Sequence, residues 1–389
     1  MAALDFGSLY TTYDSFYYPS AKVYLGGQDP TEDKKLQLFV SDFEIELTSD
    51  YKASIATFSI SGLYDSPSGK FRTEEAKKYL LLGNPVKILL GYSQNVTEVF
   101  RGYIARVEFC YSESLGDSVF ARITAMDVKG IMMANNCSKR LKANYYSDAV
   151  KEILDQAPYQ NLTNNEVIQS ITVSDTPDKP AGGGAGAGGP GGQEVDNRIE
   201  MVAESDYDFV VKAAKKFNYE FFSIGGNVAF RKAKANTQEL AEIYPSGMVL
   251  NYDISYDITG LAGEVKVRTL DIGKANKIEV KKKNTSKFSL GGKAKPLISS
   301  QSIVYIDSTI ETQADAENRA NYLLEEMSYR LGSIRMTMVG LPELVPGRFI
   351  TLKDFGDAVS NKYYITDVTH TYQNGGKFVT LLEGKAATL

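Results

Sequence analysis

The sequence contains no tryptophan and very little histidine or cysteine. Its 389 residues include one His, His370, and two Cys, Cys110 and Cys137. A single imidazole cannot build a multi-histidine metal site, and a serine hydrolase would have to depend on His370 alone. Two Cys cannot form a disulfide framework or a zinc cage, so we expect a reduced protein made in the cytoplasm. We therefore expect no cofactor and no metal, and the composition argues against an enzyme.

Neither the charge nor the hydropathy of the chain indicates nucleic acid or a membrane as a partner. The 43 Lys and Arg are balanced by 48 Asp and Glu, which leaves a net charge of -5 and no strong field of either sign. No uncharged apolar run approaches the roughly 18 residues that a membrane span needs. The N-terminus also lacks the basic and apolar regions of a secretory signal. We expect no membrane insertion.

Most of the first 130 residues alternate between apolar and polar side chains. This period of two is typical of half-buried antiparallel strands, and several such strands at short spacing predict a barrel or a sandwich. The segments with this pattern are residues 43–49, 55–62, 85–92, 98–111 and 118–127. A short helix between them is predicted to have Thr73 as its N-cap and to close at Gly83.

From about residue 141 the pattern changes to two helices and a hairpin. Ser147 is the predicted N-cap of the first helix. In the second helix Ser205 precedes Asp208 by three residues, which is the capping-box spacing, and this helix is predicted to end at Asn218. Gly225-Gly226 then separates two short strand patterns and predicts their turn.

Residues 177–193 separate these two helices and consist mostly of Gly, Ala and Pro. A segment with so few side chains to bury is predicted to be a flexible tether. It matches G-x-G-x-x-G at Gly184, Gly186 and Gly189. A dinucleotide loop needs a strand directly before it and a helix directly after it, and neither pattern is present, so we interpret the match as compositional.

The last third returns to strand patterns around one long helix. This helix is predicted from a Thr312 cap to about residue 331, and Asn374-Gly375-Gly376 is a strong hairpin turn. We therefore predict a mainly β protein in three regions: a β-barrel domain over 1–135, an α+β insert over 136–245, and a second β-barrel domain over 246–389.

Three blocks of this sequence carry a more specific pattern. The first has a G-x-x-V-x-I strand, a V-F-x-G-x-I strand and a closing Asp before an apolar patch. The second has an E-S-D-x-x-F helix before a hairpin. The third has L-x-P-G, Y-x-I-x-x-V-x-H and G-G-x-F-x-T-x-L in succession. The residues that carry these motifs include Phe100, Gly102, Asp127, Ser205, Asp206, Pro346, Gly347, His370, Gly375 and Gly376.

In their order and spacing over about 300 residues, these blocks resemble the phage late-control D family of baseplate hub proteins. Relatives of that family include the N-terminal part of the type VI secretion spike protein. The resemblance implies two antiparallel β-barrel domains, each like a tail-tube subunit, on either side of a small α+β region. It also implies a homotrimer that presents six similar barrels and adapts a hexameric tail tube to a trimeric spike around an open lumen.

The resemblance further implies which molecules the chain meets. Its partners would be a hexameric tail-tube or tube-initiator protein, baseplate wedge proteins and, within the lumen, a tape-measure protein or cargo. The needle of the fused spike proteins is missing after residue 389, so the spike would be a separate chain. Assembly would take place in the bacterial cytoplasm, and the mature protein would lie in a virion tail or in the baseplate of an injection particle.

Two other functions remain open from the sequence. A cell-wall-degrading enzyme would use a carboxylate pair, but no acidic pair stands in a recognisable lysin context. A carbohydrate-binding adhesin would suit the 25 Tyr but would leave the third motif block unexplained. We expect His370 to be a structural residue, Pro346-Gly347 to form a turn, and both Cys to be buried or half-buried.

Two surface segments are candidates for partner contact. Residues 274–295 hold eight Lys against one acid and predict a solvated loop or a basic arm that contacts an acidic partner through Lys281, Lys282 and Lys283. The N-terminal segment is rich in aromatic residues, which form either part of the first core or an anchor on a neighbouring ring. These aromatic residues are Tyr10, Tyr13, Phe16, Tyr17 and Tyr18.

Overall fold

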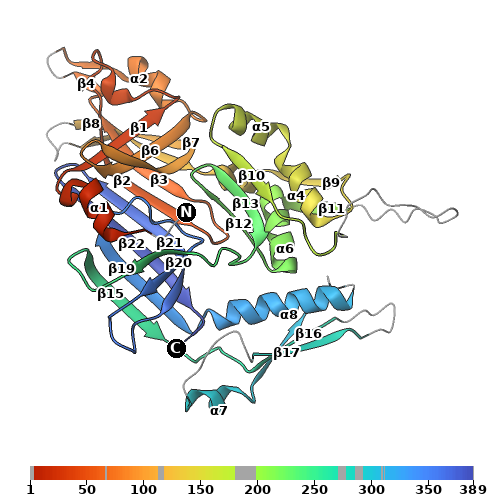
Figure 1. The fold of residues 1–389 in the computed structure, drawn as a ribbon. Helices are drawn as coiled ribbons and strands as arrows, with labels where there is room; N and C mark the ends of the chain where they lie inside the picture. Colours follow the sequence, from red (N-terminus) through yellow and green to blue (C-terminus); the bar gives the residue numbers. More distant parts are fainter. Residues whose placement is uncertain are drawn as a thin grey trace.

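The structure is a computed structural model, and it shows a mainly β protein with an α+β insert (Figure 1). It describes residues 4–65, 68–112, 118–179, 199–269, 277–284, 292–307, 310 and 312–388. From residue 180 onward the predicted tether lies outside the described residues, as do its three motif glycines. The expected mainly β fold with an α+β insert is confirmed.

The N-terminal half contributes six strands to one large antiparallel sheet. Their order is β1-β6-β7-β8-β3-β2, and every neighbouring pair is antiparallel. The alternation seen in the sequence becomes alternating burial, most regularly in β3, whose apolar residues face the core. These strands are β1 Pro19–Leu25, β2 Phe39–Thr48, β3 Ile55–Ser61, β6 Pro85–Tyr92, β7 Asn95–Ser112 and β8 Ser118–Met126.

Short helices, turns and strands connect or precede the six strands of this half. They are helix α1, two 3-10 turns, a two-stranded ribbon and helix α2. Helix α2 carries Glu74 and Glu75 in its first turn, as predicted. The elements span α1 Phe6–Thr12, η1 Asp14–Phe16, η2 Pro30–Glu32, β4 Tyr64–Asp65, β5 Lys70–Phe71 and α2 Thr73–Leu80.

The C-terminal half completes the same sheet. Strand β21 pairs with β22, β22 with β19, and β19 with the edge strand β15, all antiparallel. Strand β20 pairs with β21, and β14 lies parallel to β20. These strands are β14 Glu239–Ile243, β15 Val249–Tyr256, β19 Gly332–Val339, β20 Phe349–Leu352, β21 Lys362–Gln373 and β22 Lys377–Ala386.

The two β-rich halves are joined through β2 and β21. Six residue pairs from Phe43↔Tyr372 to Thr48↔Asp367 form this antiparallel seam. Side chains from both halves then share one hydrophobic core. Among the described strands, neither half closes into a barrel of its own. One edge of β2 pairs with β3, and its other edge pairs with β21 of the C-terminal half. The twelve strands that result are here called the main sheet; ten of them form one continuous path from β1 to β15, and β20 and β14 branch from it at β21.

The insert follows β8 and has its own core. It comprises α3 to α6 and five short strands, of which β10, β13 and β12 form one sheet and β9 and β11 form another. Its elements are α3 Val128–Ala134, β9 Asn136–Arg140, α4 Tyr146–Leu154, α5 Ala157–Asn164, β10 Ser170–Val173, β11 Glu200–Ser205, α6 Asp206–Phe217, β12 Tyr219–Ile224 and β13 Asn227–Lys232.

A third hydrophobic cluster forms around helix α8 and is here called the α8 body. Helix α8 packs on one face of a three-stranded sheet whose order is β17-β16-β18, and it lies between that sheet and the insert (Figure 1). The elements are β16 Glu264–Arg268, β17 Glu279–Lys283, α7 Ala294–Ile298, β18 Ser302–Ile306 and α8 Gln313–Ser328. The division into three domains at the predicted bounds stays a prediction. The sequence patterns do not anticipate the separate hydrophobic core of the α8 body.

Helix caps test the local sequence predictions. Ser205 with Asp208 forms the predicted capping box, Thr312 is the predicted N-cap of α8, and α6 ends at Asn218 as predicted. The structure adds that Thr312 forms a complete capping box with Asp315 and that Asn218 has the left-handed conformation. The predicted N-caps Thr73 and Ser147 were wrong, because the observed N-caps lie one and two residues earlier in the chain. Arg72 and Tyr145 occupy the cap positions without a side-chain bond, so Thr73 and Ser147 lie inside the first turns. None of the described helices is long and apolar enough to span a bilayer.

Candidate functional site at the junction of the main sheet, the insert and the α8 body

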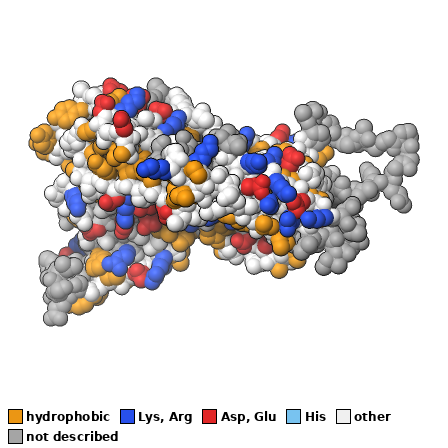
Figure 2. Space-filling view, turned by 90° about the horizontal axis from the view of Figure 1, so that it is seen from below, with side chains coloured by type: hydrophobic (Ala, Val, Ile, Leu, Met, Phe, Trp, Pro, Cys, Tyr) orange, Lys and Arg blue, Asp and Glu red, His pale blue; other side chains and the backbone are white. Residues whose placement is uncertain are grey.

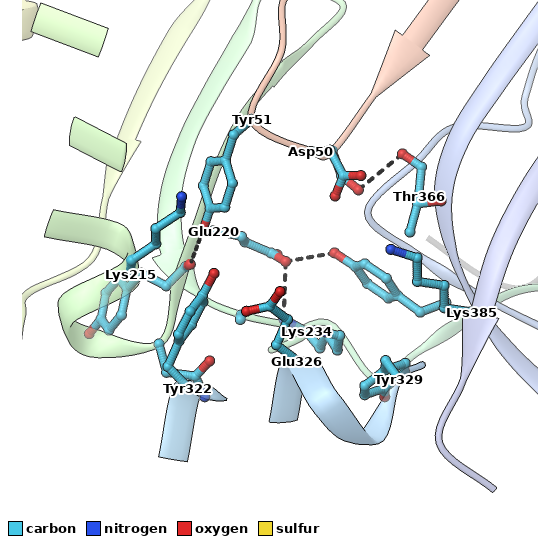
Figure 3. A pocket seen from close by; sticks show the side chains of 15 residues that line it. Asp50, Tyr51, Lys215, Glu220, Lys234, Tyr322, Glu326, Tyr329, Thr366 and Lys385 are labelled. Carbon is cyan, nitrogen blue, oxygen red and sulfur yellow. Dashed lines mark hydrogen bonds between the residues drawn. The ribbon is translucent and has the colours of Figure 1, made fainter. Parts of the chain in front are cut away.

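A cavity of about 360 Å³ lies where the three parts of the molecule meet (Figure 3). The main sheet contributes the loop after β2 and residues of β21 and β22. The insert contributes the end of α6 and the start of β12, and the α8 body contributes three side chains of one helix face. Polar lining residues include Asp50, Tyr51, Lys215, Glu220, Lys234, Tyr322, Glu326, Tyr329, Tyr364, Thr366 and Lys385.

Glu220 is the central link between the insert and the main sheet. Its carboxylate accepts a bond from Arg231 Nε at 2.7 Å, one from the Tyr364 hydroxyl at 2.6 Å and one from the Lys234 backbone N–H at 3.1 Å. Burial, together with the neighbouring Glu220 charge, raises the pKa of Tyr364 well above its ordinary value. A buried carboxylate needs such partners. The bonds from Arg231 and Lys234 hold Glu220 within the insert, and the bond from Tyr364 connects β12 to β21.

Helix α8 is attached to the insert by a second set of polar contacts. Asn218 Nδ2 donates to Glu325 Oε2 at 2.9 Å, and Lys234 Nζ lies 3.2 Å from Glu325 Oε1. The Lys234 ammonium also lies 4.5 Å from the centre of the Tyr329 ring. An ammonium group that contacts both a carboxylate and the face of an aromatic ring is held in place by two attractive interactions. Lys234 therefore ties α8 to the same junction as Glu220.

The loop after β2 closes the remaining side of the cavity. Tyr51 donates to the Tyr219 carbonyl at 3.3 Å, and Lys215 Nζ lies 4.9 Å from the Tyr51 ring centre. Burial raises the pKa of Asp50, while the nearby Lys385 ammonium opposes that shift. The charged groups of this cavity thus hold one part of the molecule against another. No group of three metal-ligating side chains occurs within the described ranges.

Phe100 and Gly102, from the first motif block, lie on β7 inside the main sheet. A Cβ placed on Gly102 would lie 2.3 Å from the Met126 carbonyl oxygen and 2.8 Å from the Phe100 ring. The backbone of a paired strand cannot shift to relieve such a contact. Only glycine at position 102 therefore allows β7 and β8 to lie this close together. These two residues therefore have a packing function within the main sheet.

Asp127 marks the point where the chain leaves the main sheet for the insert. Its side chain caps α3 through the Lys129 backbone N–H at 3.0 Å and accepts the Ser54 N–H at 3.1 Å. Lys129 Nζ lies 3.7 Å away, and both side chains are buried. Burial raises the pKa of Asp127 and lowers that of Lys129, while each partner opposes the shift of the other. The sequence gives no hint of the buried Lys129, because a lysine in a short helix is normally exposed.

Ser205 and Asp206 begin α6 and have different tasks. Ser205 forms the capping box described above. Asp206 is fully buried and accepts bonds from Tyr159 Oη at 2.7 Å, Asn135 Nδ2 at 2.6 Å and Lys139 Nζ at 3.2 Å. It thereby links the segment after α3, strand β9 and helix α5 to the start of α6. Asp206 is thus the centre of the insert's polar network.

Pro346 and Gly347 form a turn directly before β20, as predicted. Gly347 has φ +79°, and an added Cβ would meet the Phe222 ring of the insert at 3.0 Å. Its carbonyl accepts a bond from Arg231 Nη2 at 3.3 Å. This turn is therefore a further contact between the main sheet and the insert.

Gly375 and Gly376 form the predicted turn between β21 and β22. Both have positive φ, at +105° and +112°, and no heavy atom would crowd an added Cβ at either position. The turn therefore needs glycine for its backbone conformation and not for space.

His370 is a structural residue, as expected. It lies on β21 opposite Ile45 of β2 and Thr380 of β22, at the seam between the two β-rich halves. Its side chain is fully buried, with Nδ1 2.9 Å from Thr380 Oγ1. Burial lowers its pKa to about 4, although the Leu344 backbone favours the protonated ring. The ring is therefore neutral at pH 7.

The structure places parts of the two segments that the sequence marks as candidates for partner contact. Lys281, Lys282 and Lys283 lie on β17, an edge of the α8-body sheet, so they form part of a strand and not of a loop. The rest of residues 274–295 is described only over 277–284 and 292–295. In the N-terminal segment, Tyr13 is buried in the main core, whereas Tyr17 is exposed. Tyr13 therefore belongs to the core, and an anchoring role for the exposed aromatic residues stays a prediction.

The motif residues do not converge on one catalytic centre. The structure distributes them over the joints between parts of the molecule and over two turns. The sequence patterns did not predict the polar network around Glu220. No local pattern marks Glu220, because its partners come from sequence positions up to 144 residues away. Both Cys are half-buried and free, as expected. A role for the motif residues in partner contact stays a prediction.

Comparison with solved structures finds this fold in proteins described as tail proteins. The tail protein from Neisseria meningitidis MC58 aligns with a TM-score of 0.64 and 13% identity, covering 95% of this chain and 97% of that one. The 43 kDa tail protein of prophage MuSo2 from Shewanella oneidensis aligns with a TM-score of 0.65 and 10% identity, covering 94% and 98%. The chain has the fold of these tail proteins.

Other comparisons are less extensive. An Escherichia coli protein, c3393, described as a type VI secretion component similar to phage T4 tail proteins, aligns with a TM-score of 0.51 and 10% identity, covering 93% and 76%. A family model for the Alg8 N-terminal domain matches residues 193–374, fewer than half of the chain. That match ends in the β21–β22 turn and omits β22, so it does not coincide with a structural unit. No curated protein sequence matches the chain.

Proposed function

We propose that this protein is a structural subunit of a tail-like baseplate, namely the hub that connects a tail tube to a spike. The observation that carries the proposal is the fold match along nearly the whole chain, at 94–95% coverage, to two phage tail proteins. Because those matches are 10–13% identical, they support the architecture, and the function is inferred from it together with the motif blocks.

The organisation of the chain suits this role. Two β-rich halves share one sheet, and Glu220, Lys234 and Gly347 connect that sheet to the insert and the α8 body. A unit that transmits load between stacked rings needs such joints between its parts. In our proposal three copies close around a lumen, with the tube protein on one side and a separate spike on the other. Wedge proteins would contact the periphery, and a tape-measure protein or cargo would occupy the lumen.

In this proposal the protein catalyses no reaction. A glycosidase needs one carboxyl as an acid and a second as a free base or nucleophile. At the junction cavity, Asp50 has a raised pKa, but Glu220 is committed to three hydrogen bonds and Glu326 lies 3.2 Å from Arg330. This arrangement supports structural contacts over acid–base chemistry. We further propose that assembly takes place in the bacterial cytoplasm and that the mature protein belongs to a virion tail or injection particle.

Native mass spectrometry, followed by electron microscopy of the complex with its tube protein, tests this function. We expect a homotrimer that binds a hexameric ring at one face. A monomer that persists at high concentration and does not bind the tube protein would contradict the proposal. A peptidoglycan zymogram tests the enzyme alternative, for which we expect no clearing zone. A glycan array tests the adhesin alternative, for which we expect no bound sugar.

A further inference from the structure

The three-stranded sheet of the α8 body has two edges of opposite character. The β17 edge carries Lys281, Lys282 and Lys283 in succession, and lysines on an edge strand discourage pairing with another chain. The β18 edge has the sequence Ser-Ile-Val-Tyr-Ile, with no charge, no proline and three β-branched apolar residues. Among the described strands, β18 pairs only with β16. One edge is therefore protected against strand addition and the other is not.

The hydrogen bonds at the two ends of β18 show which of its backbone groups remain available. Glu264 N–H donates to the Gln301 carbonyl at 3.2 Å, and Asp307 N–H donates to the Arg268 carbonyl at 3.0 Å. In a parallel ladder, alternate residues bond to the same neighbour. Odd-numbered residues of β18 therefore face β16, while the N–H and C=O groups of Ser302, Val304 and Ile306 point away from it.

The same three residues also carry the exposed side chains of this edge. Val304 is 46% exposed and Ile306 is 66% exposed, whereas Ile303 and Tyr305 pack against the core under α8. Figure 2 views the molecule from the side of β16, β17 and α7, where apolar side chains lie among charged ones of both signs. An edge strand with free backbone groups and exposed apolar side chains is the surface that β-strand addition uses.

The charge around this edge indicates the kind of strand that it accepts. Residues 261–307 contain ten Lys and Arg against four Asp and Glu, although the whole chain has more acidic than basic residues. In the sheet register, Lys266 lies opposite Val304 and Arg268 lies opposite Ile306 on the outer face. Each of these cations has a partner within the sheet, Glu264 at 3.1 Å and Glu279 at 2.7 Å. The excess of positive charge over residues 261–307, which form the sheet and α7, nevertheless favours an acidic partner.

We infer that the β18 edge is a docking site for an extended, acidic segment of another protein, which adds a fourth strand to the α8-body sheet. Main-chain hydrogen bonds to residues 302, 304 and 306 supply affinity. Apolar residues of the incoming strand lie beside Val304 and Ile306, and its Asp or Glu residues face the surrounding basic surface. This inference does not depend on the proposed hub function, and a failure of either leaves the other standing.

The experiment uses the full chain and defined peptide probes. The probe is a fluorescein-labelled ten-residue peptide of alternating Glu and Val, and binding is followed by fluorescence anisotropy. The first control peptide alternates Lys and Val. The second is the Glu–Val peptide with N-methyl groups on alternate residues, which removes the main-chain donors of one edge. We expect only the unmodified Glu–Val peptide to bind, with the controls at least about tenfold weaker.

A matched pair of protein variants tests the edge itself. Val304→Pro removes an outward N–H that the β16 ladder does not use, and proline is tolerated on an edge strand in that position. Val304→Thr keeps the N–H and the β-branched shape. We expect the proline variant to weaken binding about tenfold or more and the threonine variant to stay within about threefold. Circular dichroism checks that each variant is folded, and Val304→Lys, with an unaltered backbone, replaces the proline variant if that one does not fold.

Four results would overturn the inference. Equal binding of the Glu–Val and Lys–Val peptides would mean that acidic character does not matter. Binding that survives both N-methylation and the Val304 substitutions would place the peptide elsewhere. Self-association of the wild-type chain that disappears in Val304→Pro would make a second copy the occupant of this edge. Absence of any peptide binding at 1 mM would count equally against the docking site.

Discussion

The single histidine allows one prediction about acid stability to be developed in detail. His370 lies fully buried at the β2–β21 seam with a pKa of about 4, against 6.5 for an exposed ring. Between these two pH values the unfolded chain binds a proton that the folded chain does not. Stability is therefore fully present above pH 6.5 and is lost as the pH falls through this range. From pH 7.5 to 5.0 the calculated loss is about 2 kcal/mol, and it approaches about 3 kcal/mol below pH 4.

The assay is urea unfolding followed by circular dichroism, because the chain has no Trp for fluorescence. The wild type and His370→Gln are compared at pH 7.5 and 5.0, at one protein concentration, so that oligomerisation affects both equally. Carboxylates titrate in both proteins, and the difference between the two pH dependences isolates the imidazole. We expect the variant to be less stable at pH 7.5 but to lose about 2 kcal/mol less than the wild type on acidification. Equal losses, or an imidazole NMR resonance that titrates near 6.5 in the folded protein, would refute this reasoning.

Three further predictions concern two joints between parts of the molecule and one helix cap, and urea unfolding checks each of them. Gly347→Ala should cost clearly more than the roughly 1 kcal/mol expected for Gly356→Ala, because both have positive φ but only Gly347 faces an aromatic ring; equal costs would mean that this contact is unimportant. Tyr364→Phe removes a buried bond to the Glu220 carboxylate and should cost about 1.5–3 kcal/mol, and a neutral effect would argue against that bond. Ser205→Ala should cost about 1 kcal/mol through loss of the α6 capping box, and an unchanged midpoint would be inconsistent with it.

Features that depend on neighbouring residues could be predicted from the sequence. The alternating strands, the capping box at Ser205, the Thr312 cap and the β21–β22 turn at Gly375-Gly376 follow from side-chain period and backbone preference within a few positions. Even locally, the Thr73 and Ser147 caps were misplaced. A helix can begin at a residue without a capping side chain when packing sets its start, as at Arg72 and Tyr145.

Features that depend on distant residues could not be predicted in this way. The β2–β21 seam pairs Phe43 with Tyr372, and nothing in either strand specifies the other. The contact of Glu220 with Tyr364 and the burial of Lys129 beside Asp127 arise only after the main sheet and the insert have met. The motif blocks did point to the tail-protein fold, because their order along the chain reflects the arrangement of whole segments.

The β2–β21 seam also affects how the chain is made. Strand β2 has emerged from the ribosome by residue 48, but its partner is complete only at residue 373. At bacterial or eukaryotic elongation rates this gap corresponds to roughly 15 to 65 s, during which one side of β2 has no native neighbour. The bulge between Ser41 and Glu44 and the acidic Glu44 and Glu46 would reduce mispairing in that interval. Nascent chains of this protein should therefore be most vulnerable to aggregation before β21 has been synthesised.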